Sequence, residues 1–383
     1  MLSSFSQSAS RISSRSSHHT ATRSADKSCL PVAAGPCDKK LPVSGLPLRV
    51  FCMRSNSSAL PTAFCFAGQG SQYYHMAVDL FNTAPVFRQW MEIGDRIVKT
   101  TQGFSPLEII YSTEHSLSDP FDHLEHSHPA LFMTQFAAAK LLQSKGIRPD
   151  LLLGVSLGEF VAMSLAGMLP FEKALKVLAH QPSVFRGTTS PGALIAILAP
   201  EQIHEQSQVL RETTEIAGMN AERHCVLAAP EVETDRVIAE LRRLDIPFQR
   251  LPVPFAFHSR WIETAQDDYL NAVKDVSFET PFWPVWSACL GAQTEAADGS
   301  FLWRIVREPM RLRATIAAIE ARGSTNYIDL SPTGTFTAIL RQEVAGGSSS
   351  SISALMSPFG GDLKRLDALV RSSPDETALD SRN

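Results

Sequence analysis

The sequence predicts an α/β fold in which a small domain of ferredoxin-like topology is inserted into a larger α/β domain. One observation behind this prediction is a short apolar strand, a tight turn flanked by glycines and a helix, which follow one another at residues 151–166. Strand, turn and helix in direct succession are typical of α/β architecture. The other observation is a run of elements at residues 193–253 in the order β-α-β-β-α-β, which is the ferredoxin-like order.

The first part of the larger domain contains two strands and several helices. Strands are expected at residues 63–67 and 151–153, both apolar enough to be buried in a parallel sheet. Helices are expected at residues 85–99, 129–144, 159–166 and 171–180. The helix at 129–144 is almost wholly apolar on one side, which indicates a core helix. Pro182 is expected to disturb the helix that begins at residue 171.

Residues 191–254 form the small domain in this prediction. Its strands are expected at 193–198, 215–218, 225–228 and 247–253, and its helices at 200–211 and 230–244. The chain then returns to the larger domain with a helix through residue 273, a strand at 284–288, a helix at 310–322 and a strand at 327–330. The larger domain therefore consists of residues 61–190 and 255–345, on either side of the insertion.

The two ends of the chain differ in composition from the rest. Residues 1–60 contain eight Lys or Arg but only two Asp, are rich in serine and lack a core-forming pattern, so we expect a disordered leader. An arginine-rich, acid-poor start also has weak features of an organelle transit peptide. Met53 is then a candidate start of the folded protein. Residues 346–383, which begin with a Gly- and Ser-rich run, are expected to form a flexible tail.

Composition argues against several classes of function. The net charge of −4 at pH 7 favours neither nucleic acid nor a membrane surface as a partner. No apolar run approaches the roughly 18 residues that a membrane-spanning helix needs. The six cysteines are scattered without a C-x-x-C pair, which argues against a disulfide framework or a zinc site and fits a reducing compartment. A metal site built from His123, His126 and His128 is the less favoured interpretation, since no cysteine accompanies them.

The turn at residues 154–158, with the sequence Gly-Val-Ser-Leu-Gly, matches the G-x-S-x-G nucleophile elbow. Such a turn holds its serine, Ser156, in a strained backbone conformation with the hydroxyl exposed, and the glycines avoid collisions with strand and helix. The N-terminus of the following helix then favours negative charge beside Ser156. The pentapeptide alone is common, so its position between a strand and a helix carries the prediction of a nucleophile.

A second loop has the features of half an oxyanion hole. The strand expected at 63–67 leads into Gly-Gln-Gly-Ser-Gln at residues 68–72. A glycine-rich loop in this position can present backbone N–H groups to an anion, although by itself it is most often only a turn. Together with the serine elbow, the loop predicts a site that stabilises a tetrahedral oxyanion.

Four segments together resemble the malonyl-CoA:acyl carrier protein transacylase family, the acyltransferases of fatty acid and polyketide synthases. They are the loop at 68–72, the elbow at 154–158, Phe-Ala-Phe-His at 255–258 and Ile-Asp-Leu-Ser-Pro at 328–332, in matching order and spacing. The resemblance extends from about residue 62 to residue 345. It implies an α/β-hydrolase-like large domain with an inserted ferredoxin-like small domain, in agreement with the elements expected from the residues.

The resemblance also implies roles in catalysis. Ser156 would be the nucleophile and His258 its general base, so that the pair forms an acyl-serine intermediate. The backbone amides of Gln69 and Leu157 would hold the oxyanion, each contributing about 3 kcal/mol. The family orients its histidine with backbone carbonyls rather than a carboxylate, and by register the carbonyl of Ile305 is the candidate.

Other positions concern the substrate or depart from the family. Phe257 and Asn220 are expected to contact the substrate, although Asn220 could equally cap a turn. Val155 occupies the second elbow position, where the family usually has histidine, and His128 replaces a residue that is typically glutamine.

The most informative departure is Gln181, at the position where the family has an arginine that binds the free carboxylate of malonyl. Arginine binds a carboxylate through a bidentate, charge-assisted pair, which a neutral glutamine cannot replace. Arg186 does not obviously substitute, because five residues rotate a helical side chain by roughly 140°. If the register is a few residues off, Arg186 could still reach the substrate.

The absence of this arginine fits the acyl hydrolase branch of the family, which occurs beside trans-acyltransferase polyketide synthases and releases acyl groups from stalled carrier-protein thioesters to water. The same-family alternative is a transacylase that loads malonyl or another acyl unit. A general α/β-hydrolase esterase or thioesterase is less favoured because of the inserted domain. A non-catalytic carrier-binding module is disfavoured because Ser156 and His258 are both present.

The expected partner is an acyl carrier protein with phosphopantetheine-linked acyl groups, and acyl-CoA is a second candidate donor. No cofactor and no metal ion are expected. The protein is expected to be a cytoplasmic monomer that binds neither nucleic acid nor a membrane.

A chain that begins at Met53 is predicted to fold and to keep full activity, because residues 1–52 lack a core-forming pattern. The measurement is urea unfolding of the full-length and shortened chains, together with their rates of acyl-serine formation. A loss of stability of more than about 1 kcal/mol would show that the leader packs on the folded domain.

Overall fold

The computed structural model describes residues 59–344 and 346–372. These residues belong to the unit Asn56–Asn383. The leader predicted at residues 1–60, with Met53, lies outside the described residues except for its last two positions, and so does the end of the tail from residue 373 onward.

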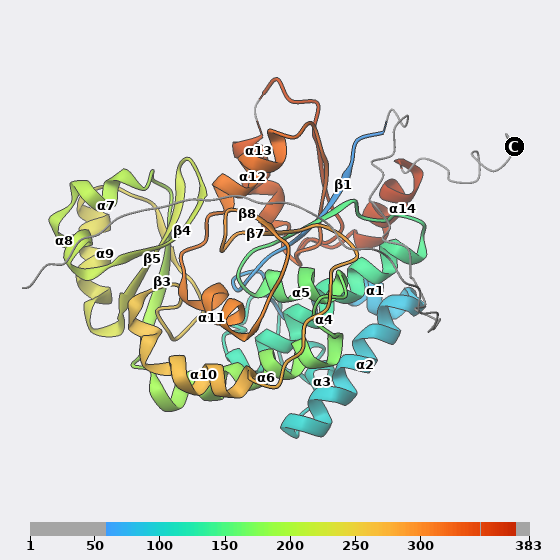
Figure 1. The fold of residues 1–383 in the computed structure, drawn as a ribbon, viewed down its shortest axis with the longest axis horizontal. Helices are drawn as coiled ribbons and strands as arrows, with labels where there is room; N and C mark the ends of the chain where they lie inside the picture. Colours follow the sequence, from blue (N-terminus) through green and yellow to red (C-terminus); the bar gives the residue numbers. More distant parts are fainter. Residues whose placement is uncertain (1–58, 345, 373–383) are drawn as a thin grey trace, which may run out of the picture. The chain divides into compact units, whose positions relative to one another are not determined.

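A six-stranded sheet with the order β10-β9-β1-β2-β7-β8 forms the centre of the large domain (Figure 1). All neighbouring pairs are parallel except β7 and β8. The strands are β1 (Thr62–Phe66), β2 (Leu151–Gly154), β7 (Val285–Ser287), β8 (Ala292–Thr294), β9 (Asn326–Asp329) and β10 (Ser351–Ala354). Because the carboxyl ends of parallel strands meet at one edge, the loops after β1, β2 and β9 converge there.

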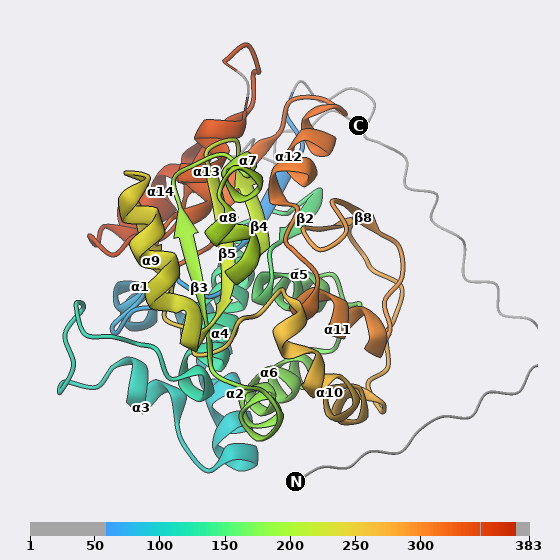
Figure 2. The same ribbon diagram turned by 90° about the vertical axis from the view of Figure 1, so that its left-hand side faces the viewer.

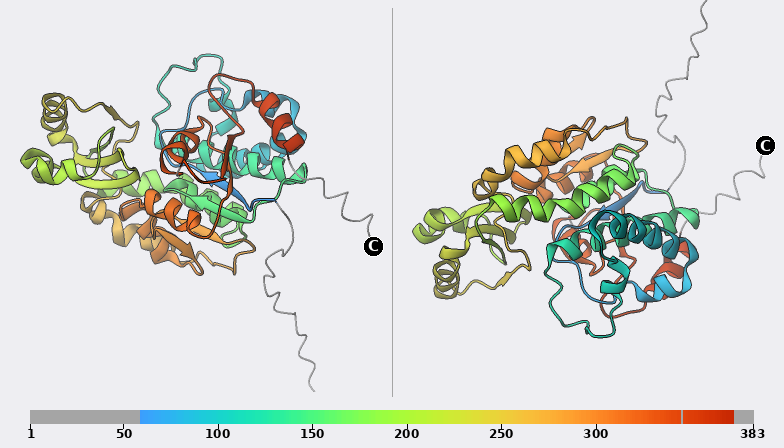
Figure 3. Two further views of the ribbon diagram at one scale, coloured as in Figure 1. Left: turned by 90° about the horizontal axis from the view of Figure 1, so that it is seen from above. Right: turned by 90° about the horizontal axis from the view of Figure 1, so that it is seen from below.

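Helices cover both faces of this sheet. Figures 1 and 2 show α12 (Leu312–Glu320) and α13 (Thr335–Glu343) on one side and α4 (Leu124–Ser144), α5 (Leu157–Leu165) and α6 (Phe171–Thr188) on the other. Figure 3 shows α2 packed beside α4 and α6. The remaining helices of the large domain are α1 (Val78–Thr83), α2 (Pro85–Gln102), α3 (Pro106–Ile110), η2 (Arg260–Ala265), α10 (Gln266–Val273), α11 (Gly299–Arg307) and α14 (Asp362–Ser372).

The helix α6 corrects the expectation that Pro182 would disturb it, because it continues through this proline to Thr188. A proline has no amide for the carbonyl four residues earlier, here that of Leu178. The imidazole of His128, buried on the neighbouring helix α4, lies beside the Leu178 backbone. The helix therefore lacks one backbone bond at Pro182 but is not interrupted.

The small domain is a four-stranded antiparallel sheet with the order β4-β5-β3-β6. Its elements are β3 (Gly192–Ile197), α7 (Gln202–Gln206), α8 (Gln208–Thr213), β4 (Glu215–Ala221), β5 (His224–Pro230), η1 (Glu231–Glu233), α9 (Thr234–Arg243) and β6 (Phe248–Arg250). This strand order in a β-α-β-β-α-β chain is ferredoxin-like, and the predicted fold class is confirmed. The helix expected at 200–211 is divided at Ser207, whose hydroxyl caps α8 by accepting from the Leu210 amide.

One strand of the small domain is also bonded to the large domain. The Met219 amide of β4 donates to the carbonyl of Met310 at 2.8 Å, and the Met310 amide donates to the carbonyl of Ala217 at 2.9 Å. The segment after α11 is therefore fixed against the small domain.

The structure corrects the expectation of a flexible tail at residues 346–383 for the part that it describes. Ser351–Ala354 forms β10, which pairs in parallel with β9, and Asp362–Ser372 forms α14, with Leu366 and Leu369 buried. The serine-rich approach to β10 looks like a linker, but Ser348 and Ser350 both donate hydrogen bonds to the Glu320 carboxylate. These side chains have partners that composition alone does not reveal. The helices α11 and α13 were likewise not anticipated.

Two further properties bear on the sequence predictions. Within the described ranges, no helix is both long and apolar enough to cross a membrane. Cys65, Cys225 and Cys289 are buried free thiols.

A chain that ends at residue 346 is predicted to be less stable than the full-length protein by at least about 3 kcal/mol, since it exposes the edge of β9 and loses two buried leucines. A chain that ends at Ser372 is the matched control and should unfold like the full-length protein. The measurement is the free energy of unfolding in urea. Equal values for the two shortened chains would contradict a structural role for β10 and α14.

Candidate active site

The elbow lies where β2 passes into α5, as the sequence predicts. Ser156 has φ 52° and ψ −121°, a strained conformation for a residue with a side chain. A Cβ on Gly158 would lie 2.0 Å from the carbonyl oxygen of Phe66, and one on Gly154 would lie 2.5 Å from Cα of Glu159. Both positions therefore require glycine, because the start of α5 touches the end of β1 and the turn folds back on itself.

The structure brings Ser156 and His258 into hydrogen-bond contact, with 2.9 Å between Oγ and Nε2. His258 also has positive φ, 61°, and its amide donates to the carbonyl of Val306 at 2.9 Å. Its Nδ1 lies 2.9 Å from the carbonyl oxygen of Glu308. A backbone carbonyl can only accept, so Nδ1 carries the proton and Nε2 is free to accept the proton of the serine.

The carbonyl that orients His258 belongs to Glu308, and the prediction of Ile305 was wrong. The helix α11 ends at Arg307, so Ile305 lies inside its last turn. Glu308 is the first residue beyond the helix, with φ −80° and ψ 151°, an extended conformation that turns its carbonyl away from the helix axis. The sequence register was therefore three residues early.

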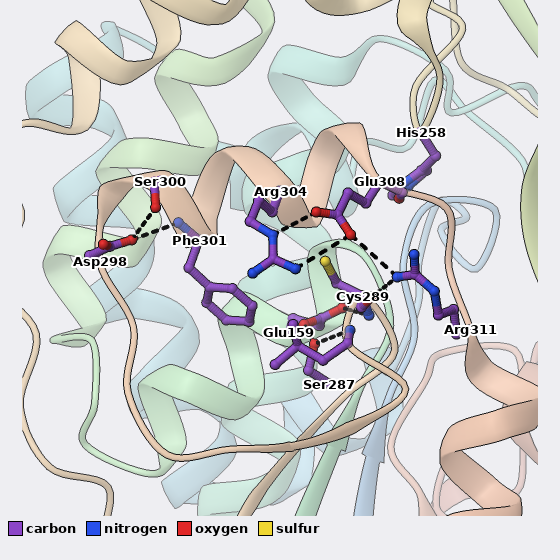
Figure 4. A network of polar contacts seen from close by, with 11 residues as sticks. Glu159, His258, Ser287, Cys289, Asp298, Ser300, Phe301, Arg304, Glu308 and Arg311 are labelled. Carbon is purple, nitrogen blue, oxygen red and sulfur yellow. Dashed lines mark hydrogen bonds and ion pairs between the residues drawn. The ribbon is translucent and has the colours of Figure 1, made fainter. Parts of the chain in front are cut away.

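Side chains around Glu308 hold this carbonyl in place (Figure 4). The Glu308 carboxylate accepts from Nε of Arg304 at 2.6 Å and from Nη1 of Arg311 at 3.3 Å. Arg311 also donates to the carbonyl of Cys289. These cations hold the pKa of the Glu308 carboxyl below its usual range.

A buried carboxyl group that the sequence interpretation missed lies at the other end of this network. Glu159, next to the elbow, accepts from the Ser287 hydroxyl and from the Cys289 amide (Figure 4). Burial raises its pKa to about 8. An acidic residue directly after G-x-S-x-G, at the start of an apolar helix, is the signal that could have marked it.

The imidazole of His258 is only 3% exposed. Burial disfavours the charged form and lowers the pKa of His258 to about 4, while the bond to the Glu308 carbonyl acts in the opposite direction. The imidazole is therefore neutral near pH 7, as a general base must be.

The predicted oxyanion amides belong to the loop after β1 and to the first residue of α5. A Cβ on Gly68 would lie 3.0 Å from Cβ of Ser156 and 3.5 Å from its Oγ, so the loop at 68–72 passes directly beside the nucleophile. Leu157 begins α5, where backbone amides have no partner within the helix. Among the described residues, no backbone acceptor is bonded to the amide of Gln69 or Leu157. Both amides are available to a tetrahedral oxyanion.

Gln181 is buried on α6 and points toward another helix. Its Nε2 donates to the hydroxyl of Tyr269 at 3.2 Å, and that hydroxyl donates to the carbonyl of Leu302 at 3.5 Å. Arg186, the alternative clamp, forms an ion pair with Glu125. Its side chain is 66% exposed. The structure thus gives both candidates for carboxylate binding other partners.

Aromatic side chains pack around the helix that carries Gln181. Phe185 lies one turn after Gln181. Its ring centroid is 4.9 Å from that of Phe257, in an edge-to-face arrangement, and 5.9 Å from that of Tyr269. Phe257 directly precedes His258, and its contact with the substrate stays a prediction. The cluster is buried and includes the residue that precedes His258. Its remaining members are Phe255 and Trp303.

The other residues singled out from the sequence lie as follows. Asn220 is buried in β4, and its Oδ1 has no hydrogen-bond partner among the described residues, so it does not cap a turn there. Val155 packs in the main core, and its amide donates to the Phe66 carbonyl at 3.1 Å.

Within residues 59–344 and 346–372, no group of three or more His, Cys, Asp or Glu could hold a metal ion. The histidines of residues 123–128 therefore do not form such a group.

Comparison with known proteins gives one family match and several relatives. The family model described as acyl transferase domain matches residues 63–371. The polyketide biosynthesis acyltransferase homolog BaeD of Bacillus velezensis is 36% identical over 317 residues, which cover 82% of this chain and 98% of that protein. The homolog PksD of Bacillus subtilis is 36% identical over 309 residues, 81% of this chain and 95% of that protein.

Solved structures show the same fold. The acyltransferase domain from the second module of the salinomycin polyketide synthase is 25% identical with a TM-score of 0.72, covering 82% of this chain and 73% of that one. MCAT from Streptococcus pneumoniae is 25% identical with a TM-score of 0.69, and the match covers 82% of this chain and 100% of that one. A malonyl-transacylase in complex with a type II PKS acyl-carrier protein is 21% identical with a TM-score of 0.69, and the match covers 82% of this chain and 100% of that one.

Acylation of Ser156 is predicted to remain fast down to about pH 5. Since the pKa of His258 is about 4, the neutral form that accepts the serine proton predominates above that pH, and the rate falls as His258 is protonated at lower pH. The measurement is the pH dependence of acyl-serine formation from an acyl thioester, with circular dichroism as a check of folding. Ser156→Ala should give no adduct at any pH. A rate that is half lost near pH 6.5 would contradict the depressed pKa.

Proposed function

The chain belongs to the acyl transferase domain family, and we propose that it takes acyl groups from acyl-carrier-protein thioesters onto Ser156 and releases them to water. The names of its relatives favour polyketide biosynthesis as the setting. The likeness to a malonyl-transacylase that was solved together with an acyl-carrier protein favours a carrier protein as the partner. The active-site geometry supplies the groups that both steps need.

In the first step, Ser156 Oγ attacks the thioester carbonyl while Nε2 of His258 takes its proton. The 2.9 Å contact places base and nucleophile within reach before substrate binds. The amides of Gln69 and Leu157 hold the negative oxygen of the tetrahedral intermediate. When the intermediate collapses, the carbon–sulfur bond breaks and His258 returns the proton to the leaving thiolate. The acyl group is then bound to Ser156 as an ester.

In the second step, water takes the place of the departed thiol. Nε2 of His258 removes a proton from this water as it attacks the ester, the same two amides hold the second oxyanion, and His258 gives its proton to Oγ of Ser156. The products are a free carboxylic acid and the regenerated serine. The bond from Nδ1 to the Glu308 carbonyl keeps the ring in one tautomer through both steps.

The observation that carries the preference for neutral acyl groups is the environment of Gln181. This position has glutamine rather than arginine, and its amide bonds to Tyr269 among aromatic rings. A malonyl carboxylate placed there would lose its water without gaining a cation, which costs several kcal/mol. Arg186 does not compensate, because it pairs with Glu125. A neutral acyl chain incurs no such cost among these apolar side chains.

We predict that the protein prefers acetyl, propionyl or longer neutral acyl thioesters over malonyl by at least about tenfold, or roughly 1.4 kcal/mol. Gln181→Arg should raise malonyl occupancy of Ser156 and reduce release of neutral free acid. The measurement is competition between malonyl- and acetyl-carrier thioesters, with mass spectrometry of the acyl-enzyme and quantitation of free acid.

Two controls separate the alternatives. Arg186→Ala should leave the preference unchanged, because this arginine is already paired; loss of malonyl loading in that variant would identify Arg186 as the carboxylate ligand. A clear malonyl preference of the wild-type protein, with transfer of the acyl group to a second carrier protein, would show that it is a transacylase instead.

A further inference from the structure

A buried glutamine outside the dyad holds the end of β1. Gln135 lies in the middle of α4, and its side chain is fully buried. Its Oε1 accepts from the Ala67 amide at 2.7 Å, and its Nε2 donates to the Ala67 carbonyl at 3.0 Å. A side-chain amide that bonds both backbone groups of one residue acts like the missing neighbouring strand. It fixes the chain where the strand has ended and the loop at 68–72 begins.

A second side chain of the same helix holds the loop two residues further on. The hydroxyl of Ser127, also fully buried, accepts from Nε2 of Gln69 at 3.1 Å. Ser127 and Gln135 are about two helical turns apart, so both reach the same side of α4. The two contacts bracket residues 67–69, which include the Gln69 amide.

We propose that Gln135 is a positioning residue for oxyanion stabilisation. Through Ala67 it holds the Gln69 amide in place beside Ser156, and Ser127 assists from the Gln69 side chain. The tolerance is small, because Gly68 lies so close to Ser156 that a Cβ would be 3.0 Å from the serine Cβ. Oxyanion donors act only when they are held at the position where the negative oxygen forms, and a displacement of about 1 Å lowers a rate by about 100-fold.

This inference rests on the acyl-serine chemistry of the proposed function, but not on whether water or a carrier thiol accepts the acyl group. It differs from a purely structural role in one measurable respect. Loss of packing alone lowers stability, whereas loss of positioning weakens binding of tetrahedral anions while binding of the ground-state substrate stays the same.

The test is Gln135→Met, which keeps the length of the side chain and removes its hydrogen bonds. Acylation is followed by the burst of nitrophenolate from p-nitrophenyl acetate, and oxyanion affinity by inhibition with phenylboronic acid, which forms a tetrahedral anion on serine. We expect the acylation rate constant to fall about 10- to 100-fold, the apparent KM to stay within about twofold, and the inhibition constant to rise by the same factor as the rate falls.

The matched control is Thr134→Val, at the adjacent position of α4. Thr134 is fully buried, and its hydroxyl has no hydrogen-bond partner among the described residues. This variant should behave as wild type in both assays. A folded Gln135→Met variant that acylates within about twofold of wild type would overturn the inference, and so would slow acylation with unchanged affinity for the boronic acid.

If Gln135→Met shows no cooperative thermal unfolding, Ser127→Ala decides the question. It removes the weaker of the two contacts and should lower both the acylation rate and the boronic acid affinity by about three- to tenfold. Unchanged values would overturn the inference. A wild-type protein that forms the acyl-serine but passes it to a carrier protein would contradict only the proposed hydrolysis.

Discussion

The close approach of Gly158 to the carbonyl of Phe66 is the constraint on which the site depends. A Cβ at Gly158 would lie 2.0 Å from that oxygen, so helix α5 can begin against the end of β1 only if this residue has no side chain. The Phe66 carbonyl also accepts the Val155 amide at 3.1 Å. This backbone contact therefore brings Ser156, the first amide of α5 and the loop after β1 close together.

His258 lies far from Ser156 in the sequence, and backbone groups hold it beside the serine. His258 is bonded through its amide to Val306 and through Nδ1 to Glu308, both beside the end of α11. The next residues are bonded to β4 of the small domain through Met310. The inserted domain is thus bonded to the segment that follows the two carbonyls contacting His258. Burial then keeps the imidazole neutral.

At position 181 the chain has a neutral glutamine where the family that it resembles has an arginine. The Gln181 side chain donates a hydrogen bond to Tyr269. The aromatic ring of Phe185 packs near that tyrosine. Arg186 forms an ion pair with Glu125. The sequence alone showed that an arginine was missing, but not whether a nearby arginine took its place. Similarly, Pro182 suggested a disturbed helix, whereas α6 continues through it to Thr188.

Local patterns in the sequence predicted most of the strands and helices, the inserted small domain and Ser156 at the elbow, because periodicity and short motifs depend on neighbours along the chain. His258 was implied by the resemblance to a known family. The tertiary structure decided which carbonyl orients the histidine, where Gln181 bonds, and that a serine-rich segment completes the sheet as β10. Backbone carbonyls are chemically alike at every position. Which of them meets a given side chain depends on segments distant in sequence, and no residue type records it.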